Sequence, residues 1–335
     1  MLGGDLFRRL GVALASPAAR DELLSHFGIT TFGTPYYVNG DNRSDGTPKG
    51  LDTNDGLSMG TPLRTVLAAY NKMTSGAHDY CIMSANSGFT FTAELDVSKS
   101  RVHFLGLDGA SRYFGPGTKW SMSTGGSANS AVVKNMGVRN TFTAIKVTND
   151  DSSTSFAVAD GGEYTQWTGV EMINTQNLGT VTDAHLLCNV DSGYFLRCVI
   201  GSSVGSNQVT GSRGNVLFTR VTIPNSVCRD TIYEDCLFPI ETNSASGASC
   251  MLFTTSTDVE RILWLKKCVF WGTKLSTTID NALQIDTAQL EGDIFMDRCT
   301  VHGIAGMNAD SLTSVYHNAA AVGVDTGQES ILSGT

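Results

Sequence analysis

The chain has 335 residues, of which 41% are hydrophobic and 16% are charged, so it can bury a sizeable core and is not disordered as a whole. Its formal net charge is −9 and its Lys and Arg residues form no run, which excludes an ordinary duplex-binding surface, so we expect no nucleic-acid partner. Glycine (36) far outnumbers proline (7), a balance that favours many short strands joined by tight turns.

Residues 1–34 are expected to form a small helical anchor. The first 22 residues carry charges and only a short apolar run, so they predict neither a secretory signal nor a membrane span. Ser16 and Pro17 form a favourable N-cap and first turn for a second short helix. Helices this small cannot bury their own apolar faces, so we expect those faces to dock on the β-rich body, on a sister chain or on another protein. The apolar side chains that we expect to make this contact are Phe7, Leu10, Leu23 and Leu24.

Residues 35–78 begin with an apolar strand at 36–38, continue through a loop rich in Asp, Asn and Gly, and end in an amphipathic helix. The helix is expected over 61–73, with Thr61 as its cap and Pro62 in its first turn. We expect it to cover the exposed end of a repetitive β-structure, because such an end would otherwise recruit other strands.

From residue 79 to about residue 303 a short strand motif recurs, with a small apolar residue two positions before another apolar one. The clearest copies are YFLRCVI (194–200), LFTRVTI (217–223), IYEDCLF (232–238), LWLKKCVF (263–270) and IFMDRCTV (294–301). The small residue in each copy, weaker copies included, is Met136, Val170, Cys198, Val221, Cys236, Cys268 or Cys299. Most gaps are about 23–34 residues, the length of one coil of a parallel β-solenoid.

In such a solenoid like residues stack on like, so we expect Met136, Val170, Cys198, Cys236, Cys268 and Cys299 to form an inward column over roughly seven or eight coils. The gap from Val221 to Cys236 is too short for a coil, so one of these two copies should lie on a different face. The eight cysteines include no C-x-x-C pair, which predicts buried free thiols that pack and do not ligate, in a protein made in a reducing cytoplasm.

The stretch YYVNGDNRSDGTPKGLDTNDGLSMGTPLRTVLAAYN (36–71) resembles the entry segment of right-handed parallel β-helix proteins of the pectin-lyase-like superfamily. Bacteriophage tailspikes and other phage virion proteins are prominent members. The resemblance implies an all-β, right-handed parallel β-helix at 79–303, an entry strand, loop and capping helix at 35–78, and a C-terminal arm at 304–335. It does not imply one activity, because the superfamily includes lyases, hydrolases and inert shafts.

Acidic residues on the repeated strands are the first candidates for catalysis. Glu171, Glu234, Asp235 and Asp297 occupy a slot that alternates with Arg197, Arg220, Lys266 and Lys267. A strand position at which the side-chain charge changes sign from coil to coil is more typical of a solvent-exposed row of charges than of the Ca²⁺ site of a lyase. A glycosidase would need two nearby carboxylates, for which 149–151 (NDD) and 160–163 (DGGE) are the best segments, although both are typical of turns.

Other motifs are weaker. GSSVG (201–205) is not followed by the helix that a nucleophile elbow needs. DNRSDG (41–46) places Arg43 where a Ca²⁺ loop needs an oxygen ligand. Trp120, Trp167, Trp264 and Trp271 could line a sugar-binding groove, but packing in a core or between chains is the favoured role. We therefore predict no catalytic, cofactor-binding or metal-binding residue.

The sequence favours a non-enzymatic phage virion protein, a trimeric decoration or cement protein bound to the major capsid protein on the capsid surface. It would be synthesised in the host cytoplasm, without a membrane partner. Phe7, Leu10, Leu23 and Leu24 are the expected capsid or trimer contacts. The alternative is a short tailspike or tail fibre that binds, with or without cleaving, a host surface polysaccharide. An ordinary polysaccharide lyase is a third possibility.

Overall fold

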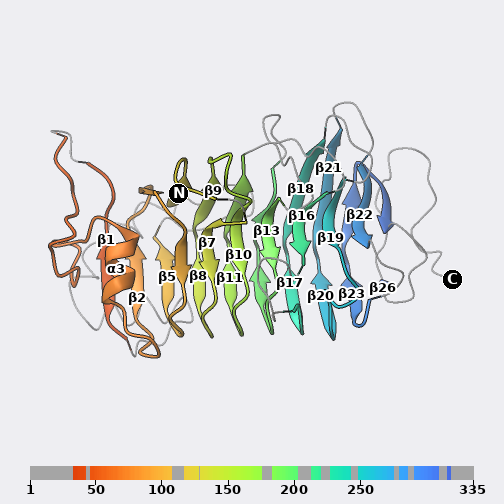
Figure 1. The fold of residues 1–335 in the computed structure, drawn as a ribbon, viewed down its shortest axis with the longest axis horizontal. Coiled ribbons are helices and arrows are strands. Elements are labelled where there is room, and N and C mark those ends of the chain that lie inside the picture. Colours follow the sequence, from red (N-terminus) through yellow and green to blue (C-terminus); the bar gives the residue numbers. More distant parts are fainter. Residues whose placement is uncertain are drawn as a thin grey trace, which may run out of the picture.

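The computed structural model describes residues 33–42, 46–107, 117–127, 129–175, 183–202, 213–219, 227–242, 248–274, 279–285, 290–308 and 315–317. Over these residues the chain winds into a solenoid of three parallel β-sheets, with one short helix at its N-terminal end (Figure 1). None of the described helices is long and apolar enough to cross a membrane. The predicted helical anchor, with Phe7, Leu10, Leu23 and Leu24, lies outside the described residues.

The three sheets are named here by the order in which the chain enters them. Sheet 1 contains β1 (Pro35–Val38), β2 (Tyr80–Met83), β5 (His103–Gly106), β8 (Thr141–Thr143), β11 (Gln166–Thr168), β14 (Tyr194–Leu196), β17 (Thr231–Glu234), β20 (Ile262–Lys266), β23 (Asp293–Asp297) and β26 (Val315–His317). Sheet 2 contains β3 (Gly88–Phe91), β6 (Lys119–Met122), β9 (Lys146–Asn149), β12 (Glu171–Asn174), β15 (Val199–Ile200), β18 (Leu237–Thr242), β21 (Val269–Lys274) and β24 (Thr300–His302). Sheet 3 contains β4 (Leu95–Val97), β7 (Ala131–Asn135), β10 (Phe156–Asp160), β13 (Ala184–Cys188), β16 (Arg213–Phe218), β19 (Ala248–Phe253), β22 (Ile279–Ile285) and β25 (Ile304–Asn308).

Each coil visits sheet 1, sheet 2 and sheet 3 in turn, and every strand pairs in parallel with its equivalent one coil away. The corner between sheets 1 and 2 is a single residue in the left-handed region. From the corner after β8 onward, φ at this position lies between 52° and 59°. These corner residues are Ala144, Gly169, Arg197, Asp235, Lys267 and Arg298. The repeated corner keeps the coils in phase, so the residue after it always points inward.

That next residue forms the inward column. Its members are Ile145, Val170, Cys198, Cys236, Cys268 and Cys299, each at most 1% exposed. The four thiols also donate weak hydrogen bonds to the coil below, for example from Cys236 to the carbonyl of Phe195 (3.3 Å). All eight cysteines are buried and free. Burial raises the pKa of the Cys81 and Cys250 thiols, which keeps them protonated.

Met136 is not a member of this column. It follows β7 in sheet 3, at the other end of the coil, and is 37% exposed. Ile145 takes its place, because it alone in that coil follows the one-residue corner. Val221 lies outside the described residues, but the segment that contains it begins in β16 of sheet 3, whereas IYEDCLF begins in sheet 1.

A stack of aromatic rings fills the core beside sheet 1. Its rings are Phe104, Phe142, Trp167, Phe195 and Tyr233, all at most 1% exposed. Successive ring centroids lie 5.1, 3.9, 6.5 and 4.4 Å apart, with interplanar angles of 11° or less. Asp160 accepts hydrogen bonds within this core from Trp167 Nε1 (2.6 Å), Thr165 Oγ1 (2.8 Å) and Asn135 Nδ2 (2.7 Å).

The helix α3 (Val66–Lys72) covers the N-terminal end of the solenoid, as the sequence predicted for this segment (Figure 1). Its N-cap is Thr65 and not Thr61, because the Thr65 hydroxyl accepts the N–H of Ala68 (3.1 Å). At the other end Lys99 Nζ donates to the carbonyls of Tyr70 (2.6 Å) and Met73 (2.7 Å), which attaches the helix to the first complete coil.

The solenoid also continues past residue 303, the end expected from the sequence. β25 pairs with β22, and β26 pairs with β23, so part of the expected C-terminal arm adds one strand to sheet 3 and one to sheet 1. The strand motif does not predict these two strands, because β25 lies in sheet 3, after the corner that Cys299 marks, and no cysteine follows β26.

Candidate functional site

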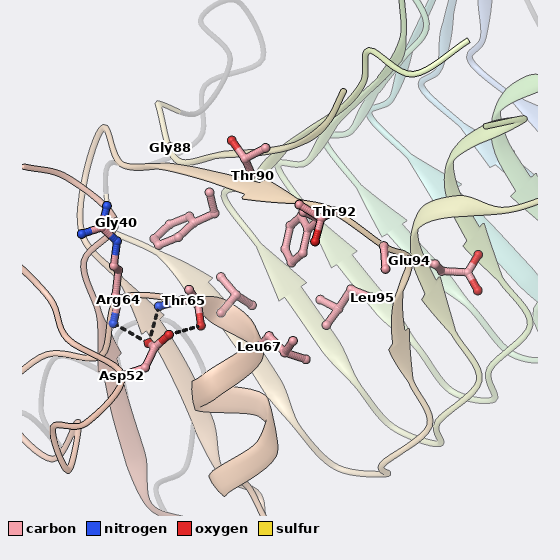
Figure 2. A pocket seen from close by; sticks show the side chains of 14 residues that line it. Gly40, Asp52, Arg64, Thr65, Leu67, Gly88, Thr90, Thr92, Glu94 and Leu95 are labelled. Carbon is pink, nitrogen blue, oxygen red and sulfur yellow. Dashed lines mark hydrogen bonds between the residues drawn. The ribbon is translucent and has the colours of Figure 1, made fainter. Parts of the chain in front are cut away.

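A pocket of about 530 Å³ opens between α3 and the first strands of sheets 2 and 3 (Figure 2). It exists because sheet 1 begins one coil earlier than its neighbours: β1 precedes β2, but the chain between them forms the loop and α3 instead of strands of sheets 2 and 3. Apolar side chains of Val66, Leu67, Phe89, Phe91 and Leu95 line it. Leu67 is 51% exposed, in contrast to the buried Val66 beside it.

Charged groups lie at opposite ends of this pocket (Figure 2). Asp52, at one end, is already engaged by the backbone N–H groups of Arg64 (2.9 Å) and Thr65 (2.8 Å). The partly exposed Arg64 guanidinium at the same end makes no salt bridge to a described residue. Glu94, at the other end, accepts the N–H of Ala131 (2.7 Å), and burial raises the pKa of its carboxyl.

The wall of the pocket includes an unpaired strand edge. Within the part of the chain that the structure describes, β3 pairs with β6 on one side only, because no described strand of sheet 2 precedes it. Lys119 donates its N–H to the carbonyl of Ser87 (2.9 Å), so Ser87, Phe89 and Phe91 direct their backbone groups to β6. The N–H and C=O of Thr90 therefore face the pocket, and a strand placed there could bond to them.

The acidic residues singled out from the sequence are paired with cations and do not converge. Glu171 binds Lys146 (2.9 Å), Asp235 binds Arg197 (3.6 Å) and Asp297 binds Arg298 (3.0 Å). Glu234 lies 4.0 Å from Lys267 and accepts the hydroxyl of Tyr194 (2.8 Å). Arg220 lies outside the described residues. Among the described side chains, no three of His, Cys, Asp or Glu come together as a metal ion requires.

The two segments considered for a carboxylate pair serve the fold. Asp151 closes a turn by accepting the N–H groups of Ser153 and Gly126 (2.8 Å each), which lower the pKa of its carboxyl. Asp160 is fully buried and faces the core, where burial raises its pKa. Arg43 of the 41–46 motif and most of the 201–205 motif lie outside the described residues.

The outer side of sheet 3 carries an apolar cluster, separate from the core, that contains no acid. Its members are Ala131, Phe156, Ala159, Ala184, Leu187, Leu217 and Leu252, each at most 1% exposed. Because successive strands are in register, these side chains form two continuous rows along the solenoid. This face therefore offers no carboxylate for chemistry at those positions.

The outer side of sheet 1 carries a partly exposed aromatic ladder, which we define as Trp264, Phe295 and Tyr316. The three residues are in register on β20, β23 and β26. Neighbouring ring centroids are 5.1 Å apart at interplanar angles of 24° and 18°. Tyr316 is 49% exposed. Since the rings face one another along the solenoid axis, the ladder presents ring edges to the outside.

Among the four tryptophans, Trp120 and Trp167 are fully buried in the core, as favoured from the sequence, whereas Trp264 lies in the ladder. Trp271 lies on sheet 2 and is 44% exposed. The sequence did not predict the pocket, nor that Tyr316 would lie in the ladder. The alternation of Phe89, Phe91 and Leu95 with polar residues was the available signal for the strand beside the pocket.

Solved structures of other proteins share the fold of this chain. Neither a protein-family model nor a curated protein sequence matches the chain. Among solved structures, a pectin methylesterase from Aspergillus niger matches with a TM-score of 0.54 at 11% identity, over 89% of each chain. The pectate lyase Pel9A matches with a TM-score of 0.55 at 11% identity, over 84% of this chain and 68% of that one. The chain has the right-handed parallel β-helix fold.

Further β-helix proteins are similar at the same low identity. PemA, a pectin methylesterase from Erwinia chrysanthemi, has a TM-score of 0.53 at 9% identity, over 88% of this chain and 92% of that one. Two phage proteins match more distantly, ORF18 of Geobacillus virus E2 (TM-score 0.41) and the Dettilon tailspike protein (TM-score 0.35). Likeness to the pectin methylesterases and the pectate lyase at this identity shows a shared β-helix and leaves the function to be argued from the sites.

Proposed function

We propose that the protein is a non-enzymatic phage virion protein that decorates the capsid as a trimer of side-by-side β-helices, held to the major capsid protein. Its role would be mechanical, because the interface area buried between neighbouring subunits stabilises the capsid. The protein would be synthesised in the host cytoplasm and would act on the capsid surface.

The observation that carries the proposal is the exposed aromatic ladder. Aromatic residues of this size dominate the energetics of protein interfaces when they become buried. Sugars stack on ring faces, but the faces between these three rings cover one another, and Lys266 Nζ lies over the Trp264 ring, 5.1 Å from its centroid. A row of ring edges is suited to packing against protein side chains, which supports association with other copies of the chain.

Two further features support a role without catalysis. The acids on the repeated strands are neutralised by cations of the same or the next coil, as in the pair of Lys146 with Glu171. The outer side of sheet 3 is apolar at the seven clustered positions. Neither arrangement supplies the general acid and base, or the metal site, that polysaccharide cleavage requires.

The first experiment measures the mass of the protein in solution by light scattering. We expect a trimer, and we expect Phe295→Arg to yield a monomer, because a guanidinium cannot be buried unpaired among ring edges. Gln166→Arg is the matched control, since Gln166 lies in the same outward row of sheet 1 outside the ladder. A monomeric wild-type protein, or a trimer that tolerates Phe295→Arg, would contradict the trimer.

The second experiment examines attachment. Deletion of residues 1–30, which include Leu10, Leu23 and Leu24, should abolish binding to purified shells. Images of intact particles should show the protein on the head. Density on the tail, or full binding by the truncated protein, would rule out this assignment.

The alternative is a short tailspike or tail fibre that binds a host polysaccharide. Trp271 favours it, because this ring is 44% exposed and makes no stacking contact with a described ring. A reducing-sugar assay on host capsule or lipopolysaccharide separates this function from decoration. A lyase would instead release an unsaturated product that absorbs in the ultraviolet, in a Ca²⁺-dependent reaction.

A further inference from the structure

The outer faces of sheets 1 and 2 both change from polar to apolar side chains toward the C-terminal coils. On sheet 1 the outward row contains, in coil order, Thr141, Gln166, Tyr194, Ile232, Trp264, Phe295 and Tyr316. On sheet 2 the outward row contains Lys119, Lys146, Glu171, Val199, Leu237 and Val269. Because each coil passes directly from sheet 1 to sheet 2, the two apolar stretches lie at overlapping levels of the solenoid.

The apolar stretch of sheet 2 is a second patch beside the aromatic ladder. We define the sheet 2 patch as Val199, Leu237, Val269 and Trp271. The first three are in register on β15, β18 and β21, and their side chains are partly exposed. Trp271 lies two residues beyond Val269 on the same face of β21 and is 44% exposed. A continuous apolar surface of this kind commonly marks a site of contact with another protein.

A closed three-fold ring needs two different contact surfaces on each copy. In a cyclic trimer every contact is heterologous, because a patch on one copy meets a different patch on the next. The aromatic ladder therefore needs a complementary surface on the neighbouring copy. The sheet 2 patch is separated from the ladder only by the one-residue corner that contains Lys267. With this corner toward the three-fold axis, sheet 1 of each copy would face sheet 2 of the next.

We propose that the aromatic ladder of one copy packs against the sheet 2 patch of the next copy. This inference rests on the proposed trimer and names the surfaces that form it. With the solenoid axes parallel to the three-fold axis, rotation brings residues of the same coil together, so Trp264 meets Trp271 of the partner subunit. The ladder presents ring edges, and edge-to-face contact with an indole ring is favourable. Trp271, the ring that favours the polysaccharide alternative, is covered in this trimer.

The charged side chains at the corner do not oppose this contact. They pair within one chain, as Arg197 with Asp235 (3.6 Å), Lys267 with Glu234 (4.0 Å) and Arg298 with Asp297 (3.0 Å). Because these cations have their own counter-ions, bringing three corners together adds little repulsion between like charges. The charged outward row of the earlier coils stays in water, which confines the contact to the C-terminal coils.

The test is the mass of charge variants of the full-length protein, measured by light scattering. Trp264→Arg and Trp271→Glu should each yield a monomer, because each places an unpaired charge in the buried contact. The double variant Trp264→Arg with Trp271→Glu should restore the trimer, since the two introduced charges meet across the contact. Ser121→Glu is the matched control, because Ser121 lies on the outer side of sheet 2 before the patch, and it should remain a trimer.

The outcomes separate this contact from the trimer itself. If Trp264→Arg yields a monomer but Trp271→Glu remains a trimer, the proposed trimer stands and its contact with sheet 2 is wrong. A double variant that stays monomeric, although circular dichroism shows a folded β-helix, also overturns the contact. A monomeric wild-type protein overturns the trimer and the contact together. If Trp271→Glu does not fold, Leu237→Glu with Ile232→Arg repeats the test one coil earlier.

Discussion

Sheet 1 carries two stacks of aromatic rings, one on each of its faces. The inner stack runs from Phe104 to Tyr233 and is fully buried, whereas the outer ladder runs from Trp264 to Tyr316 and is partly exposed. The outer ladder begins one coil after the inner stack ends, and the inward row continues with Leu265 and Met296. The inner centroid spacings range from 3.9 to 6.5 Å, on either side of the 5.1 Å in the outer ladder, because both stacks follow from in-register parallel strands.

The difference lies in what surrounds the rings. Inside the solenoid the rings are removed from water when the chain folds, so the free energy gained from their burial stabilises the folded state. Outside, the same geometry leaves apolar ring edges in water, and their burial would stabilise an assembly. Substitutions in the two stacks should therefore affect different measurements.

The largest expected effect is on the inner stack. Trp167→Ala would leave a cavity beside Phe142, whose ring centroid is 3.9 Å from that of Trp167, and should lower the free energy of unfolding by about 4 kcal/mol. Trp264→Ala should lower it by about 1 kcal/mol or less, because the ring is only partly buried. Urea denaturation followed by circular dichroism measures both. Equal losses would show that the outer ladder belongs to the folding core.

A second prediction concerns the polar support of the inner stack. Asp160→Ala removes the acceptor of Trp167 Nε1, Thr165 Oγ1 and Asn135 Nδ2, which leaves buried donors unpaired and should cost about 3 kcal/mol. Asp160→Asn, the matched control, keeps one acceptor oxygen and should cost less. The same denaturation assay checks the order, and a loss below about 1 kcal/mol for Asp160→Ala would contradict this role.

A third prediction concerns the N-terminal end of the outer face, where His103 occupies the row that later carries the ladder. Burial lowers the pKa of His103 to about 4. Between its ordinary pKa of 6.5 and about 4, the unfolded chain binds a proton that the folded chain does not, so stability falls as pH falls through this window. The loss should approach 2–3 kcal/mol, or about 1.4 kcal/mol for each pKa unit.

Denaturation at pH 7 and pH 4.5 measures this loss, and His103→Gln should flatten that part of the pH dependence. A variant with the full wild-type dependence would assign it to another group, such as the buried His185, whose pKa burial lowers to about 3.

Much of the solenoid could be predicted because its later coils repeat a recognisable local pattern. Cys198, Cys236, Cys268 and Cys299 each follow a one-residue corner, and their similar spacing reveals the coil. The earlier coils lack the cysteine that makes this pattern recognisable. Ile145 follows Ala144 in a threonine-rich segment without cysteine. The sequence pattern therefore predicted Met136 for the column, because Met136 matches the motif, but Met136 does not follow a one-residue corner.

The sites were harder to predict, because they depend on which coils lie side by side. Trp264, Phe295 and Tyr316 are separated by loops of unequal length, so no constant spacing connects them. The pocket lies between Arg64 and Glu94 because, among the described strands, sheet 2 begins one coil later than sheet 1, and the local sequence around neither residue shows this offset.

The one-residue corner between sheets 1 and 2 has a consequence for protein engineering. An extra residue there would reverse the inward and outward alternation of the strand that follows, so this corner cannot accept guest sequences. The connections from sheet 2 to sheet 3 differ from coil to coil, as residues 150–155, 175–183 and 201–212 illustrate. Epitopes or binding peptides should therefore be grafted at those connections, where the β-helix can serve as a display scaffold with a regular vertical pitch.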